Sequence, residues 1–412
     1  HRPAVALLAA QAAARGALAV VVVPLPTDPA TAPVQSVALA DVPGPLMVCA
    51  PQGAFRADPG RAVLALPIGT IVTDDHRDAW RAALPGIAVQ AEAIAARHPL
   101  DPALTATVAL DADARLRVGA DPLDLAGISG LIRDRAEATL PPGITLVTPA
   151  VPWNRLVMPA EGGWLLRDAV ARLEHQSTVL EDWGLRAQAR ASRGARLLFT
   201  GPPGTGKSLA AEVVATAAGT DMLVVDASQV VSKWIGETEK NLAAAFDVAE
   251  RTQAVLFIDE ADGLFGARTE ITDAHDRYAN LETAYLLQRL DHFDGLAVLA
   301  TNLRHNIDPA FLRRVDFVVE FPLPDPAGRY ALWALHLPDA VLADDVDVTA
   351  LARLYPIPGG WIRNAAIAAA FLAAAAGSPI GQHHLVAAVR REYAKAALPF
   401  PGEPLRRHLE AR

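Results

Sequence analysis

The stretch Gly201-Pro202-Pro203-Gly204-Thr205-Gly206-Lys207-Ser208 decides the fold of this chain. It follows an apolar run at residues 196–200 that predicts a buried strand, and it precedes an alanine-rich helical pattern that begins at Leu209. Glycines without a Cβ let successive backbone N–H groups turn toward one anion, and the following helix adds its positive end. The order of strand, glycine loop and helix is typical of a P-loop and predicts a site for nucleotide phosphates.

Lys207 and Ser208 are the side chains of this loop that we expect to take part in chemistry. A lysine at this position reaches the β- and γ-phosphates of ATP, and the following hydroxyl holds Mg²⁺. The alternative is a glycine-proline turn that binds nothing, but every specified position is present in the strand-to-helix context. ATP and Mg²⁺ are therefore the expected cofactors. The expected phosphate-binding residues are Gly201, Pro202, Pro203, Gly204, Thr205, Gly206, Lys207, Ser208 and Leu209.

A second apolar run, residues 255–258, ends in two carboxylates, Asp259 and Glu260. In doubly wound folds, ligands bind at the carboxyl ends of the strands. Asp259 can take Mg²⁺ through water, and Glu260 can polarise the attacking water as a general base. Apolar strands often end in solvated acidic residues, and that is the alternative for this pattern. The P-loop earlier in the chain is what favours a role in catalysis.

Asn302 and an arginine pair complete the candidate site. Asn302 follows an apolar run at residues 296–300, where its amide can orient the water or contact the γ-phosphate; a turn-forming asparagine is the alternative. Arg313 and Arg314 precede a further strand. They are surface charge, an internal ion pair, or a guanidinium supplied to a neighbouring subunit's γ-phosphate, where it stabilises the charge of the transition state.

The composition disfavours several classes of protein. The chain has 412 residues, a formal net charge of -9 and one cysteine, Cys49. Such a surface, with scattered Lys and Arg, repels nucleic acid and anionic membranes, so a protein partner is expected. One cysteine forms no disulfide framework within the chain and favours a reducing, cytoplasmic location. The apolar runs are interrupted or too short to span a bilayer, and no signal peptide is recognisable.

Four weak matches in the same order predict an internal duplication. The matched pairs are residues 3–23 with 209–225, 46–55 with 256–265, Trp80 with Trp333, and 94–96 with 351–353. The alternative is chance similarity between alanine-rich segments. The first copy is expected to be inactive, because Ala4 stands where the phosphate lysine belongs and Cys49-Ala50 where the carboxylates belong.

The predicted architecture is α/β, with a P-loop αβα sandwich and a parallel sheet followed by a helical domain. We expect an inactive, partial module at residues 1–145, a nucleotide-binding core at 146–324 and the helical domain at 325–412. Residues 111–152, with their proline clusters, predict the end of the first module and a linker. The helical domain is predicted as four helices, at residues 327–335, 348–354, 361–376 and 380–397.

The P-loop, Asp259-Glu260, Asn302 and the arginine pair, with a helical domain after them, resemble an AAA+ ATPase from about Trp153 onward. The resemblance implies an αβα core with a helical lid, and ATP bound at the interfaces of a ring, usually a hexamer. It also implies that the first module is a degenerate AAA-like module.

The same resemblance implies roles for three kinds of residue. Asn302 would be sensor 1, Arg313 or Arg314 the arginine finger, and Arg363 a phosphate contact where sensor 2 lies in the lid. The usual Pro-Gly-Arg insertion between the two arginines is missing, which leaves open which of them acts in trans.

Lys233, Trp234, Ile235 and Gly236 resemble the pore loop of AAA+ unfoldases. Six large rings projecting into a channel can grip a polypeptide by apolar contact and stacking, and the glycine lets the loop swing. The alternative is Trp234 packing on its own helix. Residues 268–280 would be a second pore loop or an intersubunit contact.

Longer stretches, at residues 232–242, 275–282, 311–314 and 360–364, resemble the AAA+ ATPase encoded with extracellular contractile injection systems, the phage-tail-like particles. That group carries a degenerate AAA-like module before the active one. The resemblance implies a cytoplasmic role in assembling or remodelling such a particle.

The leading hypothesis is an ATP-hydrolysing protein remodeller that works as a homo-oligomeric ring on a protein client. A DNA-directed motor or loader is a second hypothesis, and it requires a basic patch that the sequence does not show. A third is a nucleotide-gated scaffold that assembles a ring without threading a client.

Overall fold

A computed structural model gives the fold of the chain. It divides into two compact units, His1–Thr70 and Ile71–Arg412. In the larger unit the structure describes residues 73–98, 100–118, 124–137, 140–185, 194–230, 237–264, 285–302 and 309–404. In the smaller unit it describes residues 7, 10–12, 14–22, 35–36, 46–50, 55–56 and 62–66.

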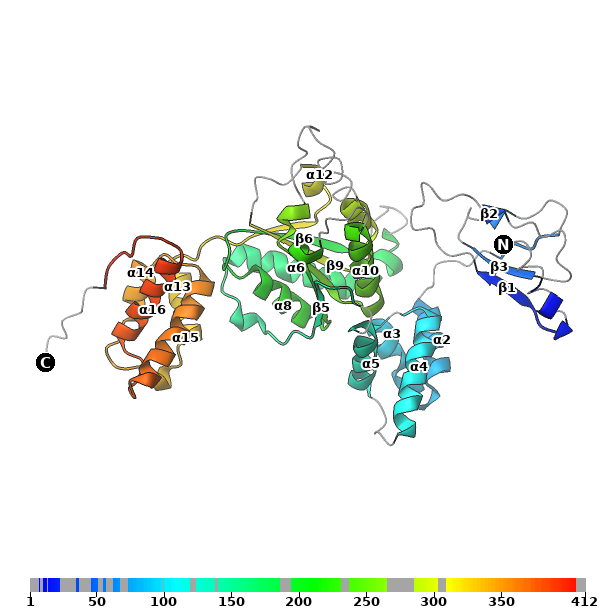
Figure 1. The fold of residues 1–412 in the computed structure, drawn as a ribbon, viewed down its shortest axis with the longest axis horizontal. Coiled ribbons are helices and arrows are strands. Elements are labelled where there is room, and N and C mark those ends of the chain that lie inside the picture. Colours follow the sequence, from blue (N-terminus) through cyan, green and yellow to red (C-terminus); the bar gives the residue numbers. More distant parts are fainter. Residues whose placement is uncertain are drawn as a thin grey trace. The chain divides into compact units, whose positions relative to one another are not determined.

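A six-stranded sheet forms the core of the larger unit (Figure 1). The strand order is β10-β6-β9-β8-β7-β5, and every neighbouring pair is parallel except β5 with β7. The strands are β5 (Ile144–Val147), β6 (Ala195–Thr200), β7 (Met222–Asp226), β8 (Val255–Asp259), β9 (Leu296–Thr301) and β10 (Phe317–Glu320). The predicted P-loop αβα sandwich is confirmed.

Alternate side chains of β6 enter two separate apolar clusters, one on each face of the sheet. Leu198 lies in a cluster with Phe246 of α10, whereas Phe199 lies in a cluster with Leu166 of α6 and Ala210 of α8. Side chains of a strand alternate between faces, and a strand covered on both faces is a nearly continuous apolar run. The helices of this core include α6 (Ala160–Ser177), α8 (Lys207–Ala218), α9 (Ala227–Val230), α10 (Glu237–Thr252) and α12 (Pro309–Leu312), and residues 285–292 are also helical.

The antiparallel edge strand β5 was not expected from the sequence. The proline clusters on either side of it favour a linker, but residues 144–147 pair with β7, and Ile144 and Leu146 are buried in the core. Prolines next to a short edge strand do not interrupt the ladder. The prediction of a linker is therefore wrong at these residues, and the boundary predicted between residues 145 and 146 falls inside the strand.

The predicted C-terminal helical domain is confirmed as four helices (Figure 1). They are α13 (Pro326–His336), α14 (Val348–Leu354), α15 (Gly359–Ala375) and α16 (Gln382–Lys395). Their shared core contains Trp333 and Tyr355, both fully buried. No helix in the described ranges is long and apolar enough to cross a membrane.

A second set of four helices lies earlier in the larger unit. It consists of α2 (Thr73–Ala83), α3 (Ala91–Arg97), α4 (Pro102–Arg117) and α5 (Leu125–Glu137). Its buried residues recur in the C-terminal set at one constant spacing along the chain. The pairs are Thr105 with Ile362, Val108 with Ala365, Ala112 with Ala369, Ile128 with Leu385, and Ile132 with Val389.

The same spacing relates the turns that follow α3 and α14. The Leu100 N–H donates to the His98 carbonyl at 2.8 Å, and the Ile357 N–H donates to the Tyr355 carbonyl at 2.9 Å. Equal helix order, equal buried positions and equal turns indicate that residues 73–137 repeat the architecture of the C-terminal helices.

The smaller unit contains two pairs of parallel strands. Strand β1 (Ala19–Val22) pairs with β3 (Leu46–Cys49), and β2 (Gln35–Ser36) pairs with β4 (Phe55–Arg56). The helical residues before β1 reach Ala14 and are followed by a turn at Gly16, whose φ is 63°, and α8 is followed by Gly219, whose φ is 68°. In both, a strand begins three residues after the glycine.

Candidate functional site

The P-loop connects the end of β6 to the start of α8. Gly201 has a φ of 149°, and a Cβ there would lie 2.2 Å from the carbonyl oxygen of Phe321, so only glycine fits. Gly206, with a φ of 103°, precedes α8 directly. No described side chain caps the first turn of α8, which leaves the N–H groups of Lys207, Ser208 and Leu209 for an anion.

Lys207 is buried against the loop that precedes it. Its Nζ donates to the carbonyl oxygens of Gly201 at 2.7 Å and Pro202 at 3.1 Å, and to Oδ1 of Asn302 at 2.7 Å. Burial lowers the pKa of Lys207, whereas the negative charges of Asp259 and Asp262 act in the opposite direction. The structure thus brings Lys207 and Asn302 into direct contact, as expected for two groups that face one phosphate site.

Ser208 and Asp259 also lie together. The Ser208 Oγ donates to Oδ2 of Asp259 at 3.2 Å, across the carboxyl ends of β6 and β8. Hydroxyl and carboxylate oxygens are the hard ligands that Mg²⁺ prefers, and Mg²⁺ commonly takes only one or two protein ligands beside substrate phosphates. Within the described ranges, no cluster of three His, Cys, Asp or Glu side chains forms an alternative metal site.

Glu260 is exposed at the same edge of the sheet. Its φ of 51° is uncommon for a residue with a Cβ, and its backbone N–H donates to Oδ1 of Asp259 at 2.9 Å. Backbone strain of this kind clusters at functional sites. The left-handed backbone at Glu260 follows the end of β8, at the position where a general base is expected.

Asp262 is a site residue that the sequence reasoning missed. Its carboxylate accepts hydrogen bonds from the Thr301 hydroxyl and from the backbone N–H of Asn302, the latter at 3.4 Å. It therefore fixes the end of β9, from which Asn302 reaches Lys207. The only sequence signal was its position in the acidic run that begins at Asp259.

The arginine pair lies at the other end of the sheet from the P-loop. Arg313 and Arg314 precede β10, whose first residue pairs with Leu197 near the start of β6, while β6 ends at the P-loop. At about 3.3 Å per residue, the intervening strand exceeds the reach of an arginine side chain. Neither arginine can contact the phosphate site of its own subunit.

The two arginines differ in their surroundings. Arg313 is exposed and forms no ion pair with the described residues. Arg314 donates through Nε to Oδ2 of Asp291 at 2.9 Å, and its side chain is 40% exposed. The pair is therefore not buried within its own subunit, and an outward-facing cation is available to a neighbouring molecule.

The C-terminal helical domain meets the P-loop at the start of α15. The Gly360 N–H donates to the Gly204 carbonyl at 2.8 Å, and a Cβ on Gly360 would lie 3.3 Å from the Cα of Gly204. Arg363, on the first turn of the same helix, is exposed and donates to Asn364 Oδ1 at 3.4 Å. The predicted phosphate contact of Arg363 stays a prediction.

The predicted pore loop, Lys233, Trp234, Ile235 and Gly236, lies outside the described residues, as do residues 268–280. The helix expected to follow that loop is present, since α10 begins at Glu237.

Comparison with known proteins identifies the family to which the core is similar. Residues 197–323 match the family described as "ATPase family associated with various cellular activities (AAA)". The chain is 38% identical to the proteasome-activating nucleotidase of Methanopyrus kandleri over 165 residues, which are 38% of each chain. It is 36% identical to the 26S proteasome subunit RPT4 of Saccharomyces cerevisiae over 185 residues, 43% of this chain and 42% of RPT4.

A third relative, the proteasome-activating nucleotidase of Saccharolobus solfataricus, is 33% identical over 204 residues, 47% of this chain and 52% of its own. The chain therefore spans about half or less of the length of these relatives. All three are named for the proteasome, two as proteasome-activating nucleotidases and one as a 26S proteasome subunit, and none is named for a contractile injection particle. The predicted link to such particles is not supported by these relatives.

Proposed function

We propose, from the AAA ATPase domain at residues 197–323, that this chain is a subunit of an ATP-driven ring that remodels proteins. One observation carries the proposal. The groups for one nucleotide converge at the carboxyl ends of β6, β8 and β9, whereas the arginine pair faces outward at the opposite end of the sheet. Such a subunit has a site that only a neighbouring copy completes.

The residues of the site divide the chemistry of hydrolysis among them. The P-loop N–H groups and Lys207 would hold the phosphates, and Asn302, held by Asp262, would contact the γ-phosphate. Glu260 would accept a proton from the attacking water as general base. Positioning and charge stabilisation account for most of the catalysis of phosphoryl transfer, so these fixed groups suit the reaction.

Ser208 and Asp259 would hold Mg²⁺. Bound there, the ion would neutralise the charge on the phosphate oxygens. Lys207 keeps its contacts to Gly201 and Asn302 until phosphate oxygens replace them.

We infer a ring, with six homologous subunits as the expected number, because Arg313 or Arg314 must reach the site of the adjoining copy. The hydrogen bond between Gly360 and Gly204 ties the lid directly to the P-loop. A phosphate that displaces the loop would therefore change the angle between core and lid. Repeated round a ring, this change would be the mechanical output.

The client is proposed to be a polypeptide that enters the ring. The three relatives named above carry names that refer to the proteasome, which favours a protein client over DNA. Trp234 and Ile235 would grip the chain, and α10 would transmit their motion to the core. A contractile injection particle remains the specific client suggested by the sequence.

For the domain organisation, we propose a degenerate AAA-like module in residues 1–145, the active core in 146–324 and the lid in 325–412. The helices at residues 73–137 support it, because they match the lid in order and in buried positions. The helix, glycine and strand order around Gly16 also supports it, because it matches that around Gly219. The first module would bind no nucleotide, since it lacks the phosphate lysine.

The substitution Glu260→Gln tests the chemistry. The variant should bind ATP normally but hydrolyse it about 10²- to 10⁴-fold more slowly, since general-base catalysis contributes about that much. Binding is measured with a fluorescent ATP analogue and hydrolysis by phosphate release. Glu161→Gln, at an exposed position on α6, is the matched control. Fast turnover in Glu260→Gln would refute the assignment of the base.

The substitution Trp234→Ala separates a threading motor from a scaffold. In a threading motor it leaves ATP hydrolysis nearly intact and abolishes the unfolding of a fluorescent protein that carries an unstructured tail. Equal unfolding of the substrate by the wild-type protein and by Trp234→Ala would favour the scaffold. Turnover stimulated by DNA, with salt-dependent binding, would instead favour the DNA-directed motor.

A further inference from the structure

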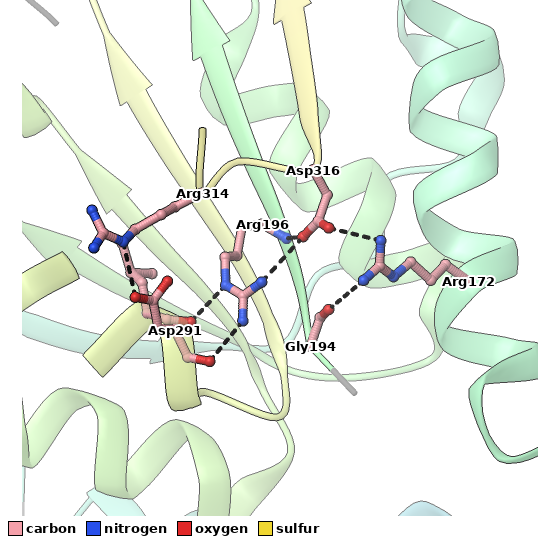
Figure 2. Close-up of polar contacts among 7 residues, drawn as sticks. Arg172, Gly194, Arg196, Asp291, Arg314 and Asp316 are labelled. Atoms are coloured by element: carbon pink, nitrogen blue, oxygen red, sulfur yellow. Dashed lines mark hydrogen bonds and ion pairs between the residues drawn. The ribbon is translucent and has the colours of Figure 1, made fainter. Parts of the chain in front are cut away.

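A buried arginine, Arg196, lies at the centre of a polar network that also includes Arg314, the second member of the arginine pair (Figure 2). Arg196, the second residue of β6, is 8% exposed. Its Nε donates to the Leu290 carbonyl at 2.6 Å, and an Nη donates to the Asp291 carbonyl at 3.0 Å. A buried guanidinium is stable only when its N–H groups are paired, so these contacts fix the segment at residues 290–291 against β6.

Asp316 is held by the same arginine from two sides. Its Oδ2 accepts from the Arg196 backbone N–H at 2.9 Å and lies 3.5 Å from an Arg196 Nη, while its own N–H donates to the Arg196 carbonyl at 2.9 Å. Its Oδ1 accepts from Arg172 of α6 at 2.8 Å, and Arg172 also donates to the Gly194 carbonyl at 3.1 Å. The residue that follows the arginine pair by two positions is thus anchored to β6 and to α6.

The other side of the pair is anchored as well. Phe311, at the end of α12, is 1% exposed in the core of the sheet, and Val315 packs against the same cluster. Arg314 is retained by Asp291, whose backbone is itself held by Arg196. Anchors on both sides leave Arg313 as the member of the pair that points to solvent without a described ion-pair partner.

We propose that Arg172, Arg196, Asp291 and Asp316 are positioning residues for a cation that acts on a neighbouring copy. In this arrangement Arg313 is the arginine that enters the adjoining phosphate site, and Arg314 stays with Asp291 in its own subunit. The inference depends on the proposed function, because it requires a ring that hydrolyses ATP.

The physical reason is preorganisation. A guanidinium that stabilises a transition state contributes most when it needs no rearrangement, and a displacement of about 1 Å can cost about a hundredfold in rate. Phe311 and Val315 anchor the segment before β10 by apolar packing, but the arginine pair between them is exposed. Charge-assisted hydrogen bonds to three different elements supply the missing rigidity.

The test uses the full chain and the variant Asp316→Asn, which keeps the shape of the side chain and removes its charge. The kcat for ATP should fall about 10- to 100-fold because the cation is displaced, while the Kd for a fluorescent ATP analogue changes less than about twofold. Arg313→Gln should lower kcat about a thousandfold, and Arg314→Gln much less. The matched control is Asp247→Asn on α10. It removes a carboxylate whose Oδ1 lies 2.6 Å from an Nη of Arg289, away from the arginine pair.

Mixed rings distinguish displacement of the cation from misfolding. Lys207→Ala subunits have no functional P-loop but an intact arginine segment, and Asp316→Asn subunits have the reverse. Mixing them should restore hydrolysis above either alone, because some interfaces then combine an intact P-loop with an intact segment. No restoration would overturn the inference, since it would mean that Asp316→Asn subunits have lost their fold or their own site.

A second variant, Arg172→Gln, removes one contact of Asp316 from a side chain that is 36% exposed. It should also lower kcat, by about threefold to tenfold. This loss is smaller than the loss expected when the cation is fully displaced. The inference would be overturned, and the proposed function would stand, if kcat were unchanged in both Asp316→Asn and Arg172→Gln. The same holds if Arg314→Gln lost more activity than Arg313→Gln. A wild-type chain that neither hydrolyses ATP nor assembles would overturn the proposed function.

Discussion

The two sets of four helices share one architecture but begin their third helix differently. In α4, Asp101 accepts a hydrogen bond from the Leu104 N–H at 2.9 Å, so this helix caps itself. In α15 no side chain caps the first turn, and the Gly360 N–H instead donates to the P-loop carbonyl of Gly204. The C-terminal set therefore pairs an N–H group of a helix start with the P-loop backbone, whereas the first set uses its own Asp101 side chain.

This difference distinguishes the positions that form the helical bundle from the positions that contact the P-loop. The buried positions recur in both sets because any such bundle must bury the same faces of its helices. The two glycines at the start of α15 have no counterpart in α4, where proline and alanine stand. Close approach to another backbone favours glycine, and of the two described sets it is the C-terminal one whose third helix approaches the P-loop backbone.

The largest effect expected from this comparison concerns nucleotide stoichiometry. Wild-type protein should bind one nucleotide per chain, and Lys207→Ala should weaken binding by at least about tenfold, because a charged hydrogen bond to phosphate contributes roughly 1.5–3 kcal/mol. Calorimetry with a non-hydrolysable ATP analogue measures both. Two nucleotides per chain, or one that persists in Lys207→Ala, would show that the first module has a working site.

Much of this site followed from local sequence. The P-loop, Asp259, Glu260 and Asn302 all end or follow strands of a parallel sheet, and the carboxyl ends of such strands meet at one edge. The lid helices followed from periodicity, and the structure moved their ends by only one or two residues.

Other features depend on contacts that no local pattern encodes. Residues 144–147 form strand β5 because they pair with β7 at the edge of the sheet, although the flanking prolines predict a linker. Asp262 contacts the backbone N–H of Asn302, and Arg314, unlike Arg313, forms an ion pair with Asp291. Each of these facts requires knowing which segments meet in space.

An intermediate effect is expected at the junction of lid and P-loop. In Gly360→Ala the new methyl group would lie 3.3 Å from the Gly204 Cα, closer than carbon atoms normally pack, so loop or helix must shift. ATP turnover should fall several-fold, up to about tenfold, which corresponds to about 1.4 kcal/mol. Steady-state hydrolysis measures it.

The matched control for this junction is the equivalent position of α4, which already carries alanine. Ala103→Gly should cost about 0.5–1 kcal/mol of stability at most and leave turnover unchanged. Equal turnover in Gly360→Ala and wild type would mean that the lid does not depend on this contact.

The smallest effect concerns the two buried tryptophans that the repeat aligns. The Trp80 Nε1 donates to the His98 carbonyl at 3.0 Å, whereas the buried Nε1 of Trp333 has no partner among the described residues. Trp80→Phe therefore loses a buried hydrogen bond, although the His98 carbonyl keeps the Leu100 N–H as a donor, while Trp333→Phe removes a donor that already lacked a partner among the described residues. Trp80→Phe should cost about 1 kcal/mol more in unfolding free energy than Trp333→Phe, since both lose similar apolar volume. Urea unfolding of the two variants measures the difference in unfolding free energy. An equal or reversed cost would show that the hydrogen bond of Trp80 does not stabilise the first set of helices.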